Sequence, residues 1–330
     1  MARPLIAALG GGTGLASLLR GLKHAPVDLT AIVTVADDGG SSGRLRRELG
    51  VPPPGDIRNC LVALADDESL LSRLFQHRFA DGDLAGHSFG NLFLAALTEV
   101  TGDFDLAIEE CSHVLKIRGQ VLPSTLARVR LWAEREDGTR VCGETRIASG
   151  RGACRRVWLD PEEPAAHVPA LEAVRRADLV LMGPGSLFSS VLVHLAIPEL
   201  AEAVTGARGL RVYVSNIMTQ PGETDGMDAA AHLARVLDVV PVDAVVVHEG
   251  ELDPLGLAAY SAQGQEPVRA DRAALEALGV RVVQAAVAQP GHVVRHDPDA
   301  LAAALLGLLE RPTAGEPVAE RSDFAGMGNL

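Results

Sequence analysis

The stretch that decides the fold is PLIAALGGGTG, residues 4–14, in which a short apolar run ends in a glycine-rich loop. Leucines then recur at helical spacing through residues 13–22. A short apolar run bounded by a turn signal and followed by a helical pattern is typical of a buried parallel strand. The opening of the chain therefore predicts a strand, a loop and a helix.

The same order recurs three more times. Apolar runs at 29–36, 178–182 and 211–215 lead into the loops DDGGSSGR (37–44), GPGS (183–186) and NIMTQPG (216–222). Loops that leave parallel strands at their carboxyl ends lie on one edge of the sheet, where ligands bind. We therefore expect an α/β fold with a mainly parallel sheet, and we expect its chemistry at that edge.

The rest of the chain predicts a helical segment and a small insert. Residues 57–115 read as successive helices, with Ser88 and Asp103 as N-caps. Residues 126–160 alternate around an Asp137-Gly138 turn, which predicts an antiparallel excursion. From residue 166 we expect helices at 166–176, 187–197, 225–238, 253–262, 271–278 and 298–309, and further strands at 243–248 and 280–285. We expect one domain over 1–310 and a loose tail over 311–330.

Composition excludes several classes of function. The 330 residues carry a net charge of −13 and 3% aromatic residues, without a basic stripe, which argues against nucleic-acid binding. The lysines are Lys23 and Lys116, and neither lies in a phosphate-binding loop. None of the four cysteines has zinc-site spacing, so we expect reduced thiols. No run of about 18 apolar residues and no signal peptide is seen, so we expect a cytoplasmic protein without membrane insertion.

The first glycine loop is a candidate anion site at Gly11, Gly12, Thr13 and Gly14, because glycines let N–H groups approach an anion at a helix amino terminus. No Gly-Lys-Ser/Thr follows, so it is not a P-loop. The dinucleotide fingerprint fails because its third glycine position is Leu15. The alternative is a tight turn that needs glycine for its geometry.

Acidic residues follow the second strand. Asp37 and Asp38 could hold ribose hydroxyls, or together with Asp56 a hard cation such as Mg²⁺ beside a phosphate. For the metal the candidates are Asp38 and Asp56. The alternative makes Asp38 a turn former and Asp56 an N-cap.

Further polar groups extend the candidate site. Hydroxyl and guanidinium groups suit phosphate or sugar oxygens, and His87 could be a general base or a hydrogen-bonded wall residue. Ser186 is better explained as an N-cap with a ligand contact than as a nucleophile, because the G-x-S-x-G elbow is absent. These candidates are Ser41, Ser42, Arg44, Arg58, Asn59, His87, Ser88, Asn91, Gly183, Gly185, Ser186, Asn216 and Thr219.

Taken together, the loops resemble one family. The chain is similar to the YvcK-type gluconeogenesis factors of the CofD-like superfamily from residue 4 to about residue 297. The segments that carry the resemblance, in order, are GGGTG (10–14), TVADDGGSSGRLR (34–46), GDIRNCL (55–61), HSFGNL (87–92), VLPST (121–125), GPGSLFSS (183–190) and MTQPGETD (218–225).

This resemblance implies a Rossmann-like, doubly wound sheet with helices on both faces, in a cytoplasmic protein that binds UDP-sugars such as UDP-N-acetylglucosamine. It implies a role in cell shape during growth on gluconeogenic carbon sources, through a protein partner in cell-wall control, and leaves a homodimer open. Family members have no established catalytic activity. The tyrosine and arginine that contact the nucleotide sugar match Tyr260 and Arg295 here, where a ring can stack on uracil and a guanidinium can pair with a diphosphate.

Two other functions remain as alternatives. The related enzyme branch transfers a phospholactyl group from a nucleotide-linked donor to a deazaflavin, and it resembles this chain in the glycine loop and the acid pair. It differs at the GDIRNCL and GPGS segments, where this chain follows the regulators. A Mg²⁺-dependent transferase is therefore the first alternative. A nicotinamide-dependent oxidoreductase is the second, and the imperfect glycine fingerprint argues against it.

Overall fold

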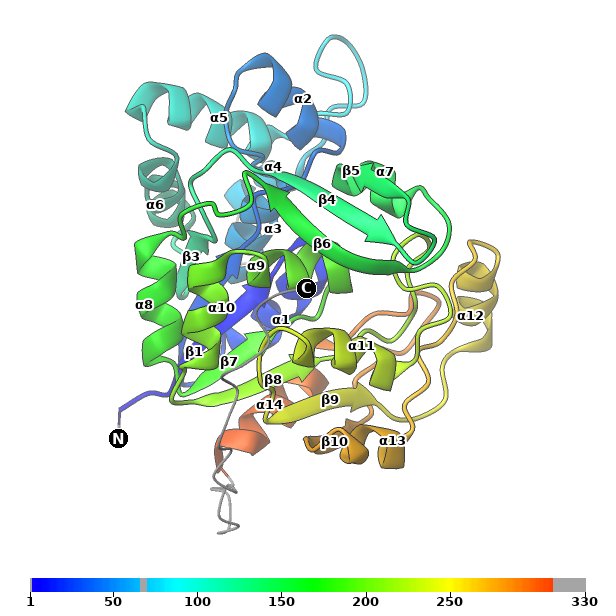
Figure 1. Cartoon of the computed structure of the whole chain (residues 1–330). Coiled ribbons are helices and arrows are strands. Elements are labelled where there is room, and N and C mark those ends of the chain that lie inside the picture. Colours follow the sequence, from blue (N-terminus) through cyan, green and yellow to red (C-terminus); the bar gives the residue numbers. More distant parts are fainter. Residues whose placement is uncertain (1, 66–69, 311–330) are drawn as a thin grey trace.

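The computed structural model describes residues 2–65 and 70–310, and a seven-stranded parallel sheet forms its centre (Figure 1). All adjacent strand pairs are parallel, which confirms the predicted fold class. In spatial order the strands are β10 (Arg281–Ala285), β9 (Ala244–His248), β8 (Leu210–Val214), β7 (Leu179–Met182), β1 (Leu5–Gly10), β2 (Asp28–Val33) and β3 (Gln120–Pro123).

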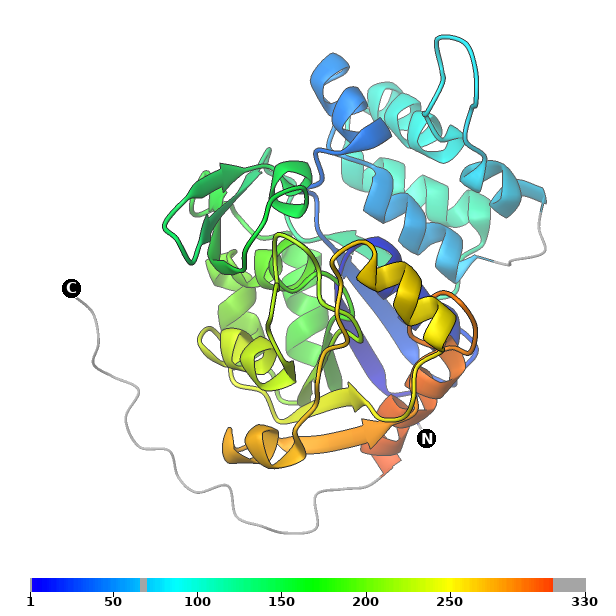
Figure 2. The same ribbon diagram turned by 90° about the vertical axis from the view of Figure 1, so that its right-hand side faces the viewer.

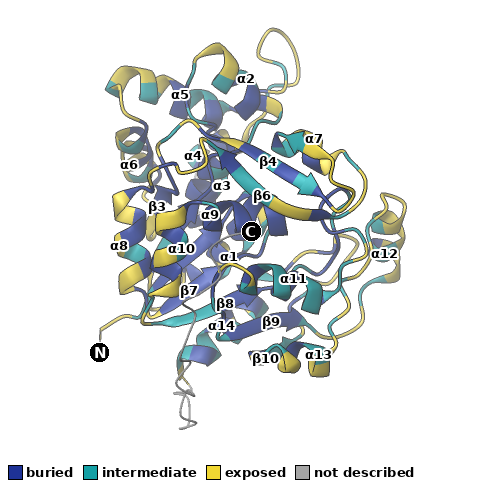
Figure 3. Cartoon of the chain, in the orientation of Figure 1, coloured by how far each residue is buried: buried dark blue, intermediate teal, exposed yellow. Residues whose placement is uncertain are grey.

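The strand order reverses between β1 and β7. From β1 the chain builds outward through β2 and β3, and it then returns to build β7 to β10 on the other side. The central strands are apolar and buried on both faces, as parallel strands between helices must be. Figure 3 shows this buried centre under helices whose outer faces are exposed.

Helices cover both faces of the sheet, as expected. On one face α1 packs against α3 and α14, and on the other α8 packs against α10 and α11 against α13. These helices are α1 (Gly12–Leu22), α3 (Gly55–Leu64), α8 (Val168–Arg176), α10 (Pro198–Thr205), α11 (Ala229–Leu237), α13 (Arg272–Ala277) and α14 (Pro298–Glu310). Helix α12 (Pro254–Ser261) lies at the edge of the molecule (Figure 1).

A helical segment and a small sheet stand beside the main sheet, at the upper right and upper left of Figure 2. Ser88 and Asp103 cap their helices through side-chain oxygens, as predicted. The segment contains α2 (Gly40–Glu48), α3, α4 (Leu70–Gln76), α5 (Phe89–Thr101) and α6 (Phe104–Leu115). The antiparallel sheet has the order β5-β4-β6, with β4 (Arg130–Arg135), β5 (Arg140–Cys142) and β6 (Cys154–Asp160).

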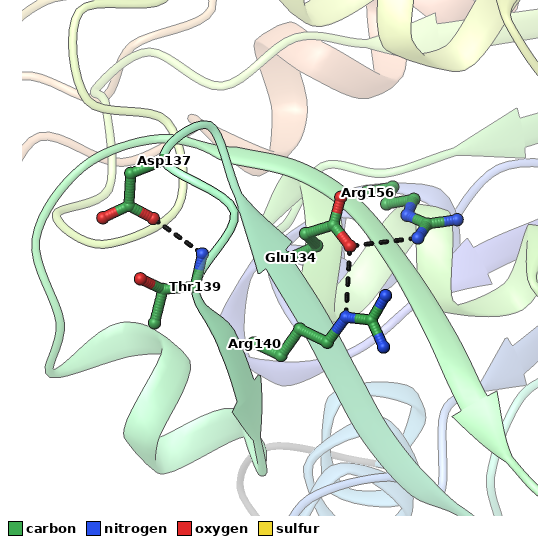
Figure 4. Close-up of polar contacts among 5 residues, drawn as sticks. All are labelled: Glu134, Asp137, Thr139, Arg140 and Arg156. Carbon is green, nitrogen blue, oxygen red and sulfur yellow. Dashed lines mark hydrogen bonds and ion pairs between the residues drawn. The ribbon is translucent and has the colours of Figure 1, made fainter.

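The small sheet confirms the predicted insert and its turn. Asp137 accepts a hydrogen bond of 2.8 Å from the Thr139 N–H (Figure 4). Gly138, between them, has φ +82°. On the outer face Glu134 lies between Arg140 and Arg156. The inner face packs on the core, where the buried Arg135 donates to carbonyl oxygens that include those of Ile147, Gly152 and Gly222.

Several local predictions were wrong. Strand β2 ends at Val33 rather than at residue 36, and α2 begins at Gly40, so Ser41 and Ser42 lie in a helix rather than a loop. Asp56 is not an N-cap, because Pro54 holds that position. Within the insert, helix α7 (Glu144–Ala148) interrupts the predicted alternation between β5 and β6.

The predicted helix at 187–197 has a different form. It consists of a π-helical turn, η1 (Leu187–Leu192), and α9 (Val193–Leu195), and α10 follows it as a separate helix. Within the described residues no single helix is long and apolar enough to cross a membrane. The helix pair Leu187–Leu195 and Pro198–Thr205 is long and apolar enough only when taken together, and it is bent by 82°. The predicted tail, 311–330, lies outside the described residues.

Candidate functional site

A cavity of about 390 Å³ lies at the carboxyl edge of the sheet, where the strand order reverses. Open α/β sheets bind their ligands at this place. The loops after β1, β7 and β8 form its wall together with α7, α12 and the segment before α14. The lining residues are Gly11, Gly12, Thr13, Gly14, Ser17, Glu144, Pro184, Gly185, Ser186, Ser190, Asn216, Ile217, Met218, Thr219, Gln220, Tyr260, Gln265, Val294, Arg295 and His296.

Two larger hollows lie at the opposite edge of the sheet. One, of about 800 Å³, is bounded by residues such as Leu5, Asp28 and Gln120 at the amino ends of β1, β2 and β3. The other, of about 1400 Å³, is bounded by residues such as Leu210 and Arg281 at the amino ends of β8 and β10. Neither contains a predicted site residue, so the smaller cavity is the candidate site.

The first glycine loop packs closely against the loop after β7 and against Asp56. A Cβ on Gly14 would lie 2.5 Å from the Pro184 carbonyl oxygen, and one on Gly11 would lie 2.6 Å from the Asp56 carboxylate. Gly12 has φ +61°, in the left-handed region that favours glycine. Both the predicted tight turn and the close approach to a ligand cavity are therefore present at this loop.

The chain's own carboxylates occupy part of the predicted anion cradle. The Gly12 N–H at the start of α1 hydrogen-bonds to Asp56. At the start of η1, the Phe188 and Ser189 N–H groups each donate to Glu223 over 3.3 Å. Because these amides already have an acceptor, an anion in the cavity must use other donors.

Amide side chains link the loops after β7 and β8. The Asn216 Oδ1 accepts from the Gly185 N–H at 3.3 Å, and the Gln220 side-chain amide donates to the Ser186 Oγ at 2.7 Å. Thr219 lines the cavity, yet its hydroxyl accepts from the Glu266 N–H at 2.9 Å. Asn216, Ser186 and Gln220 thus present polar atoms to the cavity in positions that these bonds fix.

Tyr260 and Arg295, which the resemblance implies as ligand contacts, line the same wall of the cavity. The Tyr260 hydroxyl donates to the Val294 carbonyl at 3.1 Å, which ties α12 to the segment that carries Arg295. Arg295 is exposed, and its guanidinium has no hydrogen-bond or ion-pair partner among the described residues. Burial lowers the pKa of the neighbouring His296 to about 4, so His296 is neutral at pH 7. Arg295 is therefore the cationic side chain among the described residues that line the cavity.

Carboxylates gather on the side of the cavity towards β2. Burial, then the charges of Asp56 and Asp37, raise the pKa of Glu144 well above its usual range. Burial, then the charge of Asp37, raises the pKa of Asp56 to about 7. The cavity is therefore electrostatically polar, with carboxyl groups on one side and Arg295 on another.

Asp38, one of the two predicted metal ligands, has a structural role. The Asp38 carboxylate accepts from the Thr145 N–H and hydroxyl at 3.0 and 2.9 Å, so it holds α7, and with it Glu144, against the end of β2. Among the described residues no group of three His, Cys, Asp or Glu side chains could hold a metal ion. The residues therefore do not fit a preformed Mg²⁺ site.

The cavity unites about half of the predicted ligand residues. Gly183 is buried in the turn before it, with φ +87°. A second group lies outside the lining, at the helical segment: Ser41, Ser42, Arg44, Arg58, Asn59, His87, Ser88 and Asn91. Asp37 belongs to neither group. Its carboxylate accepts a hydrogen bond from the Gly39 N–H and also hydrogen-bonds to Ser42.

Sequence reasoning missed several lining residues. Two of them, Gln220 and Ser190, lie in the MTQPGETD and GPGSLFSS segments, so those motifs could have marked them. Glu144 comes from the insert, and no motif marked it. Only the tertiary contact between α7 and the end of β2 brings it to the cavity.

Comparison with known proteins identifies the family. A model of the family described as 2-phospho-L-lactate transferase CofD matches residues 6–288. The gluconeogenesis factors of Halalkalibacterium halodurans and Bacillus subtilis are each 48% identical to this chain over 93% of its length, covering 97% and 99% of those proteins.

A solved structure agrees with these relatives. The crystal structure of a UPF0052 family member from Bacillus halodurans superposes with a TM-score of 0.90 at 48% identity, covering 93% of this chain and 100% of that one. The glycine loop lines the cavity at the point where the strand order reverses. The chain belongs to the CofD family, among the YvcK-type (UPF0052) gluconeogenesis factors.

Proposed function

We propose that this protein binds a UDP-sugar, such as UDP-N-acetylglucosamine, in the cavity at the switch point, and that it acts as a cytoplasmic regulator. The single observation that carries the proposal is the wall formed by Tyr260 and Arg295. An aromatic ring that can stack on a base and an unpaired guanidinium that can pair with a diphosphate line one cavity.

The chemistry of the other walls suits the rest of such a ligand. Asn216, Ser186 and Gln220 offer amide and hydroxyl groups, which recognise sugar hydroxyls by hydrogen bonding. Glu144 can accept hydrogen bonds from the same hydroxyls. Because its neighbours are carboxylates, we place the neutral sugar towards Glu144 and the diphosphate towards Arg295.

The biological part of the proposal comes from the relatives. Two of them are named gluconeogenesis factor, and we propose a role in gluconeogenic growth for this chain. We further propose that it supports normal cell shape during that growth through a protein partner in cell-wall control. A nucleotide sugar is a precursor of cell-wall polymers, so a protein that senses it is suited to that role.

Isothermal titration calorimetry tests the binding. We expect saturable heat with UDP-N-acetylglucosamine and none with NAD(H), because the glycine loop lacks the dinucleotide fingerprint. No heat at millimolar UDP-N-acetylglucosamine would overturn the proposal.

A transferase activity is the second candidate. The description of the matching family model and the carboxyl groups beside the cavity favour it. Turnover of a nucleotide-linked phospholactyl donor, abolished by Asp56→Asn, would support it. Absence of turnover with saturating donor and deazaflavin, with and without Mg²⁺, would exclude it.

A further inference from the structure

Three arginines and a histidine converge at the helical segment, outside the UDP-sugar cavity. Arg44 on α2 donates to the Ala85 carbonyl at 2.7 Å, and Arg78 donates to the adjacent Gly86 carbonyl at 2.5 Å. His87 follows in the chain, and its Nδ1 lies 2.9 Å from the Ser41 hydroxyl. The two guanidiniums are thus held on neighbouring carbonyl groups, close to the imidazole.

Arg58 on α3 is the buried member of this group. It is 9% exposed, and its methylene chain lies against Gly90, where a Cβ would meet its Cδ at 2.9 Å. Burial first, and the charge of Arg78 next, lower the pKa of Arg58. The Arg58 side chain therefore lies against the same His87–Gly90 segment that carries the histidine.

No carboxylate of the described residues forms an ion pair with these arginines. Arg44, Arg58 and Arg78 make no ion pair within 4.0 Å in the described part of the chain, and the Asp56 charge acts on Arg58 only as a weaker influence. Buried cations in proteins are normally paired, because removing a charge from water costs several kcal/mol. Arg58, the buried member of the group, therefore lacks the ion pair that its burial calls for.

Two buried polar atoms of the helical segment, one on Arg58 and one on Asn91, have no hydrogen-bond partner. Arg58 uses Nη2 to donate to the Asn59 Oδ1 at 2.6 Å, while its Nε has no hydrogen-bond partner. Asn91, next to Gly90, is 2% exposed, and its Oδ1 has no partner either. Unsatisfied groups of this kind are rare in native proteins and indicate a missing ligand, ion or water.

We propose that Arg44, Arg58 and Arg78 form a second binding site, for the phosphate group of a small molecule. Guanidinium forks bind phosphate oxygens through paired, charge-assisted hydrogen bonds. A bound phosphate supplies the missing negative charge and accepts hydrogen bonds from the guanidinium groups. The hydroxyl of Ser41 and the imidazole of His87 line the same place and can add further contacts.

This site explains why the motifs DDGGSSGR, GDIRN and HSFGN contain polar residues that the UDP-sugar cavity does not use. Arg44 comes from the first, Arg58 from the second and His87 from the third. The second site is independent of the proposed UDP-sugar binding, since none of its residues lines that cavity.

Thermal unfolding with inorganic phosphate as the probe tests the site. At constant ionic strength set with NaCl, phosphate should raise the Tm of the full chain in a saturable manner, since a ligand that binds only the folded state stabilises it. The double variant Arg44→Gln/Arg78→Gln should weaken the apparent phosphate affinity at least tenfold. Both side chains extend from the surface or partly buried positions, so we expect this variant to fold.

Two matched variants decide the interpretation. Arg146→Gln/Arg281→Gln removes the same charge at exposed positions elsewhere and should leave the phosphate response unchanged. An equal loss in this control would mean an adventitious ion only. Arg295→Ala should also keep the response, and its loss there would place the phosphate in the UDP-sugar cavity. Either result would overturn the proposal.

The titration of His87 provides a second readout. Burial, then the charge of Arg44, lower its pKa, with Arg78 acting in the same direction and Glu48 opposing. Bound phosphate offsets the arginine charges, so it should raise the pKa of His87 in an NMR titration, with the resonance assigned through His87→Asn. An unchanged His87 pKa at saturating phosphate would contradict the site.

Discussion

Replacing Arg295 by alanine removes the cationic group from the described wall of the cavity. Its guanidinium is exposed and makes no contact that stabilises the fold. The substitution should therefore change the free energy of unfolding by no more than about 0.5 kcal/mol. Its effect on binding can be separated from its effect on folding, which makes this residue the best single probe of the site.

The size of the binding effect follows from the type of contact. A hydrogen bond to a charged group contributes about 1.5–3 kcal/mol. Each 1.4 kcal/mol corresponds to about a factor of ten in Kd, so Arg295→Ala should weaken UDP-N-acetylglucosamine binding roughly 10- to 150-fold. Charge reversal in Arg295→Glu should weaken it further, because the diphosphate would then meet another carboxylate on the opposite side from Glu144.

Isothermal titration calorimetry measures both variants at the same ionic strength. Arg281→Ala is the matched control, because it is also an exposed arginine but lies at the amino end of β10, away from the cavity. Its Kd should equal that of the wild type. An unchanged Kd in Arg295→Ala, or an equal loss in the control, would remove Arg295 from the site.

Four further outcomes are expected. Tyr260→Ala should weaken binding roughly 2- to 10-fold in calorimetry, because it loses about 0.5–1.5 kcal/mol of stacking. Tyr260→Phe loses only the hydrogen bond to Val294 and should keep most of the affinity, and the reverse order would contradict base stacking. In urea denaturation, Gly14→Ala should lower the free energy of unfolding by more than roughly 1 kcal/mol, because the added Cβ is forced against the Pro184 carbonyl. The control Gly307→Ala in α14, whose Cβ meets no atom within 4 Å, should be neutral or stabilising, and equal effects of the two variants would refute the close packing of the two loops. The folded-state pKa of Asp56, about 7, lies above its unfolded value of 3.8, so its contribution to stability is present at low pH and is lost as pH rises from about 4 to 7. The decrease in Tm over this range should be smaller in Asp56→Asn, and an identical decrease would show that another group titrates. UDP-N-acetylglucosamine affinity should increase as pH falls from about 8 to 6, because protonation of Asp56, whose pKa is about 7, removes negative charge beside the cavity. This dependence should flatten in Asp56→Asn, and a pH-independent wild type would argue against a carboxyl group near the ligand.

The sheet could be predicted because its strands carry their own signal. The apolar runs before the GGGTG and GPGS segments are buried on both faces, and that burial requires no knowledge of their partners. Caps such as Ser88 and Asp103 are equally local, since the side chain bonds the backbone two or three residues further on. The predicted insert also follows from local alternation and a turn.

The site was only partly predictable, because tertiary contacts decide which polar groups remain free. The sequence marks glycine loops and helix starts as anion sites, yet it does not show that Asp56 and Glu223 reach two of them. Asp38 resembles a ligand in the sequence and serves as the support of α7. Glu144 reaches the cavity only through that support.

The separation of the candidate ligand residues into two groups has the same origin. Loops after parallel strands share one edge, which brings Gly12, Asn216 and Arg295 together as expected. Arg58 and His87 belong to the helical segment instead, and its position relative to the sheet depends on packing between helices that no periodicity reports.

The most direct measurement is a crystal structure of the full chain with UDP-N-acetylglucosamine. We expect the nucleotide sugar between the Gly12 loop and Ser186, with the uracil on Tyr260, the diphosphate at Arg295 and the sugar facing Glu144. Density for the ligand at the opposite edge of the sheet, or in the cavity with its diphosphate against Glu144, would contradict the assignment.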